Sequence, residues 1–262
     1  MRIVLVISYI GTNYNGWQIQ EGKQTVQQTI QDAIYKLTGE RVKIYGSGRT
    51  DSGVHAYRQV AHFDTKSIIK PEKFAFAINQ YLPNDIRIVS SRQVESKFNA
   101  RFDVKKKTYE YKFYSSKIEL PFDLLRAYQL PFNVDEEKMR QCANAFVGTF
   151  DFTPFCKVDK VEKDRVRTIY SCKILKKDEI HYSVEVCGNG FLHNMVRILV
   201  GTIIDVGIGK INLNEIKSIL SQCSVLGENK FNATNFQQMA QLRQKTGRTL
   251  PPYGLYLKNV EY

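Results

Sequence analysis

An arginine and an aspartate lie two residues apart in the glycine-rich stretch at residues 46–53, which reads G-S-G-R-T-D-S-G. A plain hairpin connection would use Asp51 and Ser52 as turn residues. A phosphate-binding nest would combine backbone N–H groups with Arg49, although the stretch lacks the spacing G-x-x-x-x-G-K-S/T of nucleotide-binding loops. A third interpretation is a catalytic carboxylate presented on a rigid bend. The pattern alone leaves all three interpretations open.

A carboxylate that works in a dry pocket needs a cation nearby to stay ionised. Without one, desolvation favours the protonated acid. Arg49 lies two residues from Asp51, but an arginine from elsewhere in the chain would serve better. The catalytic interpretation therefore predicts a second arginine beside this loop.

The charge balance of the chain favours a nucleic-acid partner. The 262 residues carry a formal net charge of +12, from 38 Lys and Arg against 26 Asp and Glu. Such an excess is typical of proteins that bind polyanions. No basic amphipathic helix with an aromatic face stands out, and no apolar run approaches the ~18 residues of a membrane span. The apolar start alternates like a strand, so we expect a cytoplasmic protein with no membrane association.

The cysteines and histidines do not form a metal-binding pattern. No two of the five cysteines have C-x-x-C spacing, and the four histidines do not cluster with them. A zinc site is therefore not expected. An odd number of cysteines in a large chain is typical of reduced, buried thiols.

The first hundred residues contain six predicted elements in the order β-α-β-β-α-β. Thr25 and Gln28 form a capping box for a helix over residues 25–38, which Gly39 ends. A second helix starts at Pro71 with Phe74, Ile78 and Tyr81 on one face. The predicted strands cover residues 2–10, 41–47, 58–64 and 86–92.

The same order of elements recurs in the rest of the chain. Helices are predicted at residues 135–147, stopped by Gly148, at 192–206 and near 213–222, and strands at 108–115, 166–176, 180–188 and from 254 onward. We therefore predict an α+β fold of two ferredoxin-like units, residues 1–104 and 105–262, whose antiparallel sheets join into one long mixed sheet. RNA-recognition modules share this unit, but their aromatic motif is absent from residues 58–63.

Seven segments, in order along nearly the whole chain, resemble the tRNA pseudouridine synthase A (TruA) family. They are Y-N-G-W-Q-I-Q at residues 14–20, G-R-T-D-S-G-V-H at 48–55, Q-V-A-H-F at 59–63, A-R-F at 100–102, Y-E-Y at 109–111, F-L-H-N-M-V-R followed by V-G at 191–201, and G-L-Y-L at 254–257. The resemblance implies the pseudouridine synthase fold and an isomerase without cofactor or metal. It also implies that uridine becomes pseudouridine at tRNA positions 38, 39 or 40, in the anticodon arm, and that homodimers carry the tRNA across both subunits.

The resemblance also assigns three catalytic residues. It implies that Asp51 is the catalytic aspartate, Arg197 its salt-bridge partner and Tyr109 the ring that packs on the target base. The physical chemistry of Arg197 is consistent with this role. The helix around it is apolar almost all round, and an arginine there is expensive unless a buried acid pairs with it. Tyr109 alternates with Tyr111 and Phe113 on one strand, so without the resemblance it would be interpreted as ordinary core.

Candidate substrate contacts come from cations and histidines near the loop. Arg49, Arg58 and His55 are predicted to contact the RNA. The run at residues 105–107 is a candidate phosphate contact, although such runs are usually solvated surface. His55 and His62 are not assigned as general bases, and Trp17 is expected in the core. The polar stretch at residues 224–252 either binds RNA or packs on the protein.

Two other function classes compete with the enzyme. A catalytically silent tRNA-binding module would keep the basic surface but could lose Asp51 or Arg197, and both are present. A phosphate-binding hydrolase built on residues 46–53 would need metal ligands or a second acid nearby, and the sequence offers neither. The pattern therefore favours the synthase.

Overall fold

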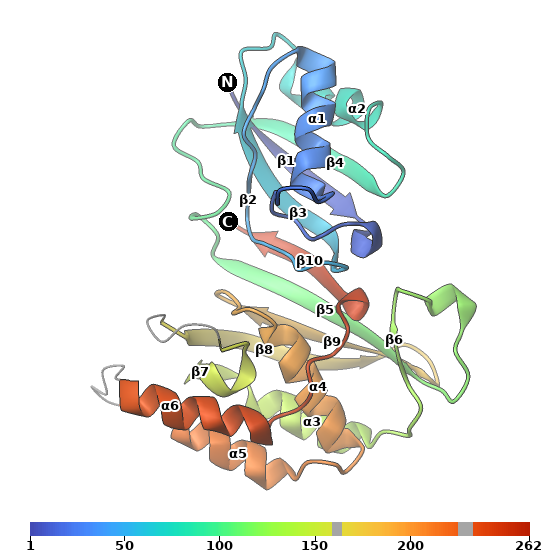
Figure 1. The fold of residues 1–262 in the computed structure, drawn as a ribbon, viewed down its shortest axis with the longest axis vertical. Helices are drawn as coiled ribbons and strands as arrows, with labels where there is room; N and C mark the ends of the chain where they lie inside the picture. Colours follow the sequence, from blue (N-terminus) through green and yellow to red (C-terminus); the bar gives the residue numbers. More distant parts are fainter. Residues whose placement is uncertain (159–163, 225–232) are drawn as a thin grey trace. The chain divides into compact units, whose positions relative to one another are not determined.

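The structure, a computed structural model, describes residues 1–158, 164–224 and 233–262. The chain divides into two compact units, one made of Met1–Lys107 with Tyr256–Tyr262 and the other of Thr108–Leu255 (Figure 1). The sequence assigned all of residues 105–262 to the second unit. The structure instead returns the last strand to the first unit, because β10 (Leu255–Glu261) pairs in parallel with β3 (His55–Asp64).

The first unit has the predicted β-α-β-β-α-β order. Its elements are β1 (Arg2–Tyr9), α1 (Val26–Thr38), β2 (Tyr45–Gly46), β3, α2 (Phe74–Asn79) and β4 (Ile86–Val94). The strands lie in the order β4-β1-β3-β10, and β2 also pairs with β3. Both helices cover one face of this sheet (Figure 1). The predicted N-cap and end of α1 are confirmed, because Thr25 Oγ1 accepts from the N–H of Gln28 at 3.4 Å and Gly39 has a left-handed φ of 74°. The second half of the predicted capping box is replaced, because the Gln28 side chain donates to Asp32 Oδ1 at 2.7 Å instead of turning back to Thr25.

Two predictions in this unit were wrong. The strand predicted over 41–47 is only two residues long, because side chains of α1 form hydrogen bonds with both backbone groups of Ile44. Gln31 accepts from the N–H of Ile44 at 3.1 Å, and Gln27 donates to its carbonyl at 2.9 Å. Tyr81 was expected on the buried face of the second helix, but α2 ends at Asn79 and leaves Tyr81 44% exposed.

The second unit combines a sheet with a layer of helices. Its elements are β5 (Lys106–Ser115), β6 (Tyr128–Leu130), α3 (Glu136–Ala145), β7 (Gly148–Asp151), β8 (Val166–Lys176), β9 (His181–Gly188), α4 (Met195–Gly207), α5 (Leu213–Gln222) and α6 (Ala233–Leu242). The strands lie in the order β5-β9-β8-β7, and β6 pairs in parallel with β5. Helix α3 packs on β8, and α4 and α5 pack on α3. Both units are therefore α+β, as predicted.

Most differences between the predicted and the observed elements of the second unit concern short elements. Strands β6 and β7 were not predicted, since three or four residues carry little periodicity. Gly148 opens β7 instead of only stopping α3. Helix α4 begins three residues later than predicted, because Asn194 has a left-handed φ of 60°. Brief 3₁₀ turns lie at Gly11–Asn13, Pro71–Lys73, Pro121–Asp123, Thr153–Phe155, Arg243–Lys245 and Pro252–Gly254.

Candidate active site

The Asp51 loop is held by the segment that follows β1. The N–H of Trp17 donates to the carbonyl of Thr50 at 3.1 Å, and the N–H of Gly53 donates to the carbonyl of Tyr14 at 3.3 Å. Tyr9 Oη lies 2.8 Å from Thr50 Oγ1. The residues on both sides of Asp51 are therefore fixed to one neighbouring segment, and the aspartate lies on a constrained bend.

Two glycines permit this close approach of segments. A Cβ on Gly16 would lie 2.5 Å from the carbonyl oxygen of Thr50, and Gly16 also has a positive φ of 80°. A Cβ on Gly46 would lie 2.6 Å from the indole of Trp17. Trp17 is only 2% exposed, as predicted for a core residue. The Y-N-G-W segment thus supports the Asp51 loop from within the core of the first unit.

Lys107 and Gln59 hold the start of the loop. Lys107 Nζ donates to the carbonyl of Ser47 at 2.7 Å, and Gln59 Nε2 donates to the carbonyl of Gly48 at 3.0 Å. A Cβ on Gly48 would lie 2.9 Å from Lys107 Nζ, so glycine leaves room for the ammonium group. Burial, and secondarily the charge of Arg101, lowers the pKa of Lys107 from 10.5 to about 8.

The sequence groups Lys107 with its two neighbours as a solvated or phosphate-binding run. In the structure its ammonium group instead supports the Asp51 loop. The available signal was the alternation of the strand, which places Lys107 in register with Tyr109 and Tyr111. A lysine on the side that carries buried tyrosines calls for a specific hydrogen-bond acceptor.

The structure separates the predicted RNA contacts into exposed and buried groups. Arg49 and Arg58 are exposed, and Asp51 is partly exposed. Arg49 stands between two anchored residues, Gly48 and Thr50, so its backbone is fixed while its side chain is presented to solvent. His55 is 1% exposed and accepts a hydrogen bond from the N–H of Gly11 at 3.0 Å through Nδ1. Its burial favours a structural role over contact with RNA.

In the second unit, Arg197 of α4 makes hydrogen bonds to nearby residues. Its Nε donates to the carbonyl of Leu250 at 2.6 Å, and one terminal nitrogen donates to Asn194 Oδ1 at 2.9 Å. Asn194 makes no side-chain cap for the helix and accepts from Arg197 instead. The neighbouring residues Val196 and Ile198 are buried, whereas Arg197 keeps intermediate exposure. These two bonds give the guanidinium polar partners within an otherwise apolar helix.

Tyr109 lies on β5 with an aromatic neighbour. Its ring is 8% exposed and meets Phe191 edge to face, with centroids 5.2 Å apart and an interplanar angle of 87°. The sequence indicates Phe191 only as part of the segment before Arg197. The neighbouring Tyr111 is fully buried and donates to the carbonyl of Pro251 at 2.9 Å, and burial raises its pKa well above the usual value.

The described residues hold no group of three or more His, Cys, Asp or Glu side chains arranged to bind a metal ion. No helix within the described ranges is long and apolar enough to cross a membrane. The site residues divide between the two units: Arg49, Asp51, His55 and Arg58 belong to the first, and Tyr109 and Arg197 to the second.

Comparison with known proteins gives a consistent result over the full length. A family model described as tRNA pseudouridine synthase matches residues 5–103 and 142–262. The chain is 43% identical over 263 residues to tRNA pseudouridine synthase A of Acetivibrio thermocellus, covering 100% of this chain and 99% of the relative. It is 41% identical over 261 residues to the protein of the same name from Caldicellulosiruptor saccharolyticus, with the same coverage. A solved Cbf5-Nop10-Gar1 complex is much more distant, with 14% identity, a TM-score of 0.30 and coverage of 77% of this chain and 54% of that one.

Proposed function

The chain belongs to the tRNA pseudouridine synthase family, and we propose that it isomerises uridine at positions 38, 39 or 40 of the tRNA anticodon arm with Asp51 as the catalytic carboxylate. The observation that carries this proposal is the construction of the Asp51 loop. Backbone hydrogen bonds fix the loop at Thr50 and Gly53, on either side of a carboxylate that remains partly exposed. A preorganised group of this kind suits a reaction whose atoms must be aligned closely.

The reaction depends on the alignment of the uridine with a catalytic group, because uridine and pseudouridine contain the same atoms and no second substrate is consumed. The N1–C1′ bond of uridine breaks, the uracil turns, and a C5–C1′ bond forms. The C5 proton leaves and N1 takes one up, so product and substrate have the same atoms. A carboxylate can attack C1′, attack the base, or take a proton from the sugar, and Asp51 is proposed to supply that carboxylate. No cofactor is required by this balance.

Arg197 is proposed as the cation that keeps the Asp51 carboxylate ionised during the reaction. An opposite charge favours the ionised acid, whereas desolvation alone favours the neutral acid. Hydrogen bonds to Leu250 and Asn194 orient the Arg197 guanidinium. If the two residues work as a pair, Arg197→Met and Asp51→Asn should have strongly non-additive effects on the free energy of unfolding. Additive effects would contradict the pairing.

Tyr109 is proposed to stack on the target uracil after it leaves the RNA helix. Removing a base from its stack costs a few kcal/mol, and a new aromatic contact returns about 1–3 kcal/mol. The ring of Tyr109 is already oriented by its edge-to-face contact with Phe191. Tyr109→Phe should therefore retain more activity than Tyr109→Ala, because it keeps the stacking surface.

We further propose that exposed cations of the first unit bind the tRNA backbone. Arg49 and Arg58 are both exposed, and the chain as a whole carries a net charge of +12. Phosphate contacts supply affinity without reading the sequence. Arg49→Gln and Arg58→Gln should each raise the Kd for tRNA. The rate at which bound tRNA is converted to product should stay nearly unchanged. His55 is a weaker candidate for this role because its ring is buried.

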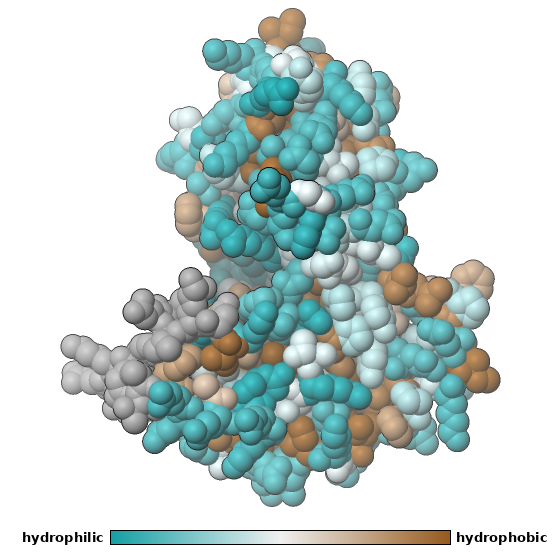
Figure 2. All heavy atoms as spheres, viewed as in Figure 1, coloured by the Kyte–Doolittle hydropathy of each residue, from teal (hydrophilic) through white to brown (hydrophobic). Residues whose placement is uncertain are grey.

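The protein is proposed to act as a homodimer in the cytoplasm, with tRNA across both subunits. Support comes from an apolar patch on the segment between β5 and β6 and just beyond it, visible as brown atoms in Figure 2. Phe122 is 98% exposed and Ile118 74%, and Leu124, Leu125 and Phe132 are also exposed. Leu125 has a positive φ of 56°, an uncommon conformation for leucine. Clustered exposed apolar side chains mark interaction surfaces, so Phe122→Asp should produce monomers in light scattering.

The direct test maps pseudouridines in tRNA from cells that carry wild-type protein, Asp51→Asn or no protein. Asp51→Asn should bind tRNA normally and lose activity by several orders of magnitude. Asp32→Asn, the same change at an exposed helix position of the first unit, is the matched control and should remain active. A silent RNA-binding module would leave the modification pattern unchanged when the protein is absent.

A further inference from the structure

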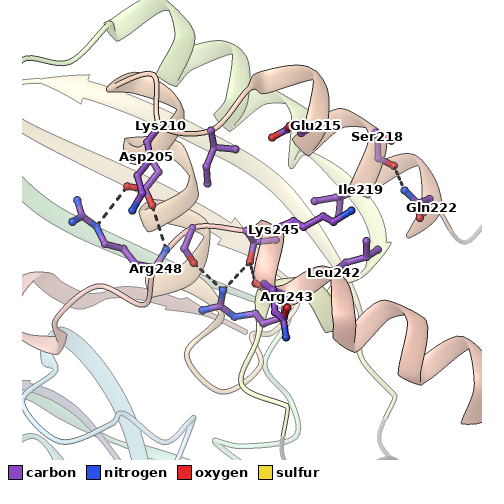
Figure 3. Close-up of a pocket in the computed structure, with 14 residues that line it drawn as sticks. Asp205, Lys210, Glu215, Ser218, Ile219, Gln222, Leu242, Arg243, Lys245 and Arg248 are labelled. Carbon is purple, nitrogen blue, oxygen red and sulfur yellow. Dashed lines mark hydrogen bonds and ion pairs between the residues drawn. The ribbon is translucent and has the colours of Figure 1, made fainter.

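Residues 243–250, here named the strap, lie along helix α4 in the second unit and form one wall of a cavity. The cavity has a volume of about 710 Å³, and the turn after α4 and helix α5 form the other walls (Figure 3). The strap contains the turn Arg243–Lys245 and precedes the last strand. It belongs to a polar stretch whose role the sequence left open.

The strap is bonded to α4 at successive turns of the helix. Leu250 and Arg197 exchange two bonds, one from the N–H of Leu250 to the carbonyl of Arg197 at 3.4 Å and one from Arg197 Nε to the carbonyl of Leu250 at 2.6 Å. The N–H of Gly247 donates to Thr202 Oγ1 at 2.9 Å. The position of the strap therefore contributes to the direction of the Arg197 guanidinium, together with the bond to Asn194.

The backbone of the strap contacts the backbone of α4 directly, because each of them has a glycine at the point of contact. A Cβ on Gly201 would lie 2.0 Å from the carbonyl oxygen of Arg248, and a Cβ on Gly247 would lie 2.3 Å from the backbone nitrogen of Thr202. Asp205, which is 1% exposed, adds an ion pair with Arg248 at 3.6 Å (Figure 3). Contact this close leaves little freedom for the strap to shift without moving Leu250.

Arg243 holds the strap in its bent conformation. One terminal nitrogen donates to Thr246 Oγ1 and to the carbonyl of Gly247, both at 2.9 Å, and the other donates to Thr249 Oγ1 at 3.1 Å. Figure 3 shows the Arg243 guanidinium turned toward the residues that follow it in the strap. A planar guanidinium can reach these three acceptors together, whereas a single ammonium nitrogen on a flexible stem cannot hold the same geometry.

We propose that Arg243 is a positioning residue for the reaction, which keeps the strap in the conformation where Leu250 aims the Arg197 guanidinium. This inference rests on the proposed role of Arg197. Arg243 is not expected to touch the RNA, so it should influence the chemical step and not the affinity for tRNA. A small displacement of a positioned group can lower a rate by about 100-fold.

The test measures kcat, KM and tRNA affinity for Arg243→Met and Arg243→Lys. We expect kcat to fall about 10-fold to 100-fold in both variants, with the Kd for tRNA within about threefold of wild type. Lys210→Met, a substitution of an exposed cation on the rim of the same cavity, is the control and should leave kcat unchanged. Unchanged kcat in a folded Arg243→Met protein would overturn the proposal.

Two further measurements separate positioning from a general loss of folding. In an Arg197→Met background, Arg243→Met should lower the residual kcat no further, because both changes remove the same function. Independent, multiplicative losses would overturn the proposal. Millimolar guanidinium should partly restore kcat in Arg243→Ala, since the vacated site opens on the cavity, and sodium at equal ionic strength should not. Failure of guanidinium to restore any activity to the folded variant would count against it.

The result for Arg197→Met alone distinguishes this inference from the proposed function. If that variant keeps full activity, the proposed role of Arg197 is wrong and the inference about Arg243 falls with it. If Arg197→Met is inactive while Arg243→Met is fully active, the proposed function stands and only the positioning role is refuted.

Discussion

Replacing Lys107 with methionine should change how the stability of the protein depends on pH. The Lys107 ammonium group is largely removed from water beneath the Asp51 loop, and its bond partner is the neutral carbonyl of Ser47, 2.7 Å away. Burial, followed by the charge of Arg101, lowers its pKa from 10.5 to about 8. Between pH 8 and pH 10.5 the unfolded chain holds a proton on this lysine that the folded chain has released. The free energy of unfolding therefore rises with pH in this window.

The size of the effect follows from the two pKa values. They differ by about 2.5, and at 1.36 kcal/mol for each unit of pKa this amounts to about 3 kcal/mol over the whole window. Lys107→Met also removes the bond from the charged ammonium to Ser47, worth about 1.5–3 kcal/mol. Below pH 8, where the lysine is charged in both the folded and the unfolded chain, that loss is a constant offset. The slope against pH therefore isolates the titration from the hydrogen bond.

The assay is urea unfolding of wild type and Lys107→Met at several values between pH 7 and pH 10. The difference in unfolding free energy between them should change by more than 1 kcal/mol across this range, in favour of wild type as pH rises. Lys105→Met, at an exposed position two residues earlier, removes the same charge from the surface and serves as the control. Parallel profiles for wild type and Lys107→Met would refute the reasoning.

Three other outcomes are expected. Gly46→Ala should destabilise the protein by about 1–3 kcal/mol in urea unfolding, because its Cβ would lie 2.6 Å from the buried indole of Trp17. Gly190→Ala is the control and should be nearly neutral in the same assay, since the nearest neighbour of its Cβ would be the Arg167 side chain at 3.7 Å. Affinity for tRNA should fall steeply with salt, with a slope that reports the number of phosphates contacted, and a flat dependence would contradict binding through exposed cations. Burial lowers the pKa of His62, so wild type should lose stability relative to His62→Gln as pH falls below about 6.5, where only the unfolded chain takes up the proton. Identical acid-unfolding profiles would rule out that linkage.

Local features of this protein could be predicted from the sequence because their causes lie within a few residues. Thr25 and Gly39 bound α1 as expected, since a cap uses backbone groups in the adjacent turn. Asp135 begins α3 in the same way, with its carboxylate accepting from the N–H of Lys138 at 3.0 Å. The excess of basic residues favoured a nucleic-acid partner because charge is a property of composition. The tRNA pseudouridine synthase family was indicated by the resemblance of seven short segments, which are also local features.

Features that join distant residues were decided only by the tertiary structure. Ile44 looked like part of a strand, but two glutamines of α1 occupy its backbone. Lys107 looked like a surface cation, yet its acceptor is Ser47, sixty residues away. The carbonyl of Leu250, fifty-three residues after Arg197, accepts from the Arg197 guanidinium, and no local pattern in the sequence pointed to it. A buried polar group must find a partner, but its residue type does not say where. Which carbonyl lies within 3 Å depends on how helices, strands and loops far apart in the chain pack together, and that packing is a property of the whole fold.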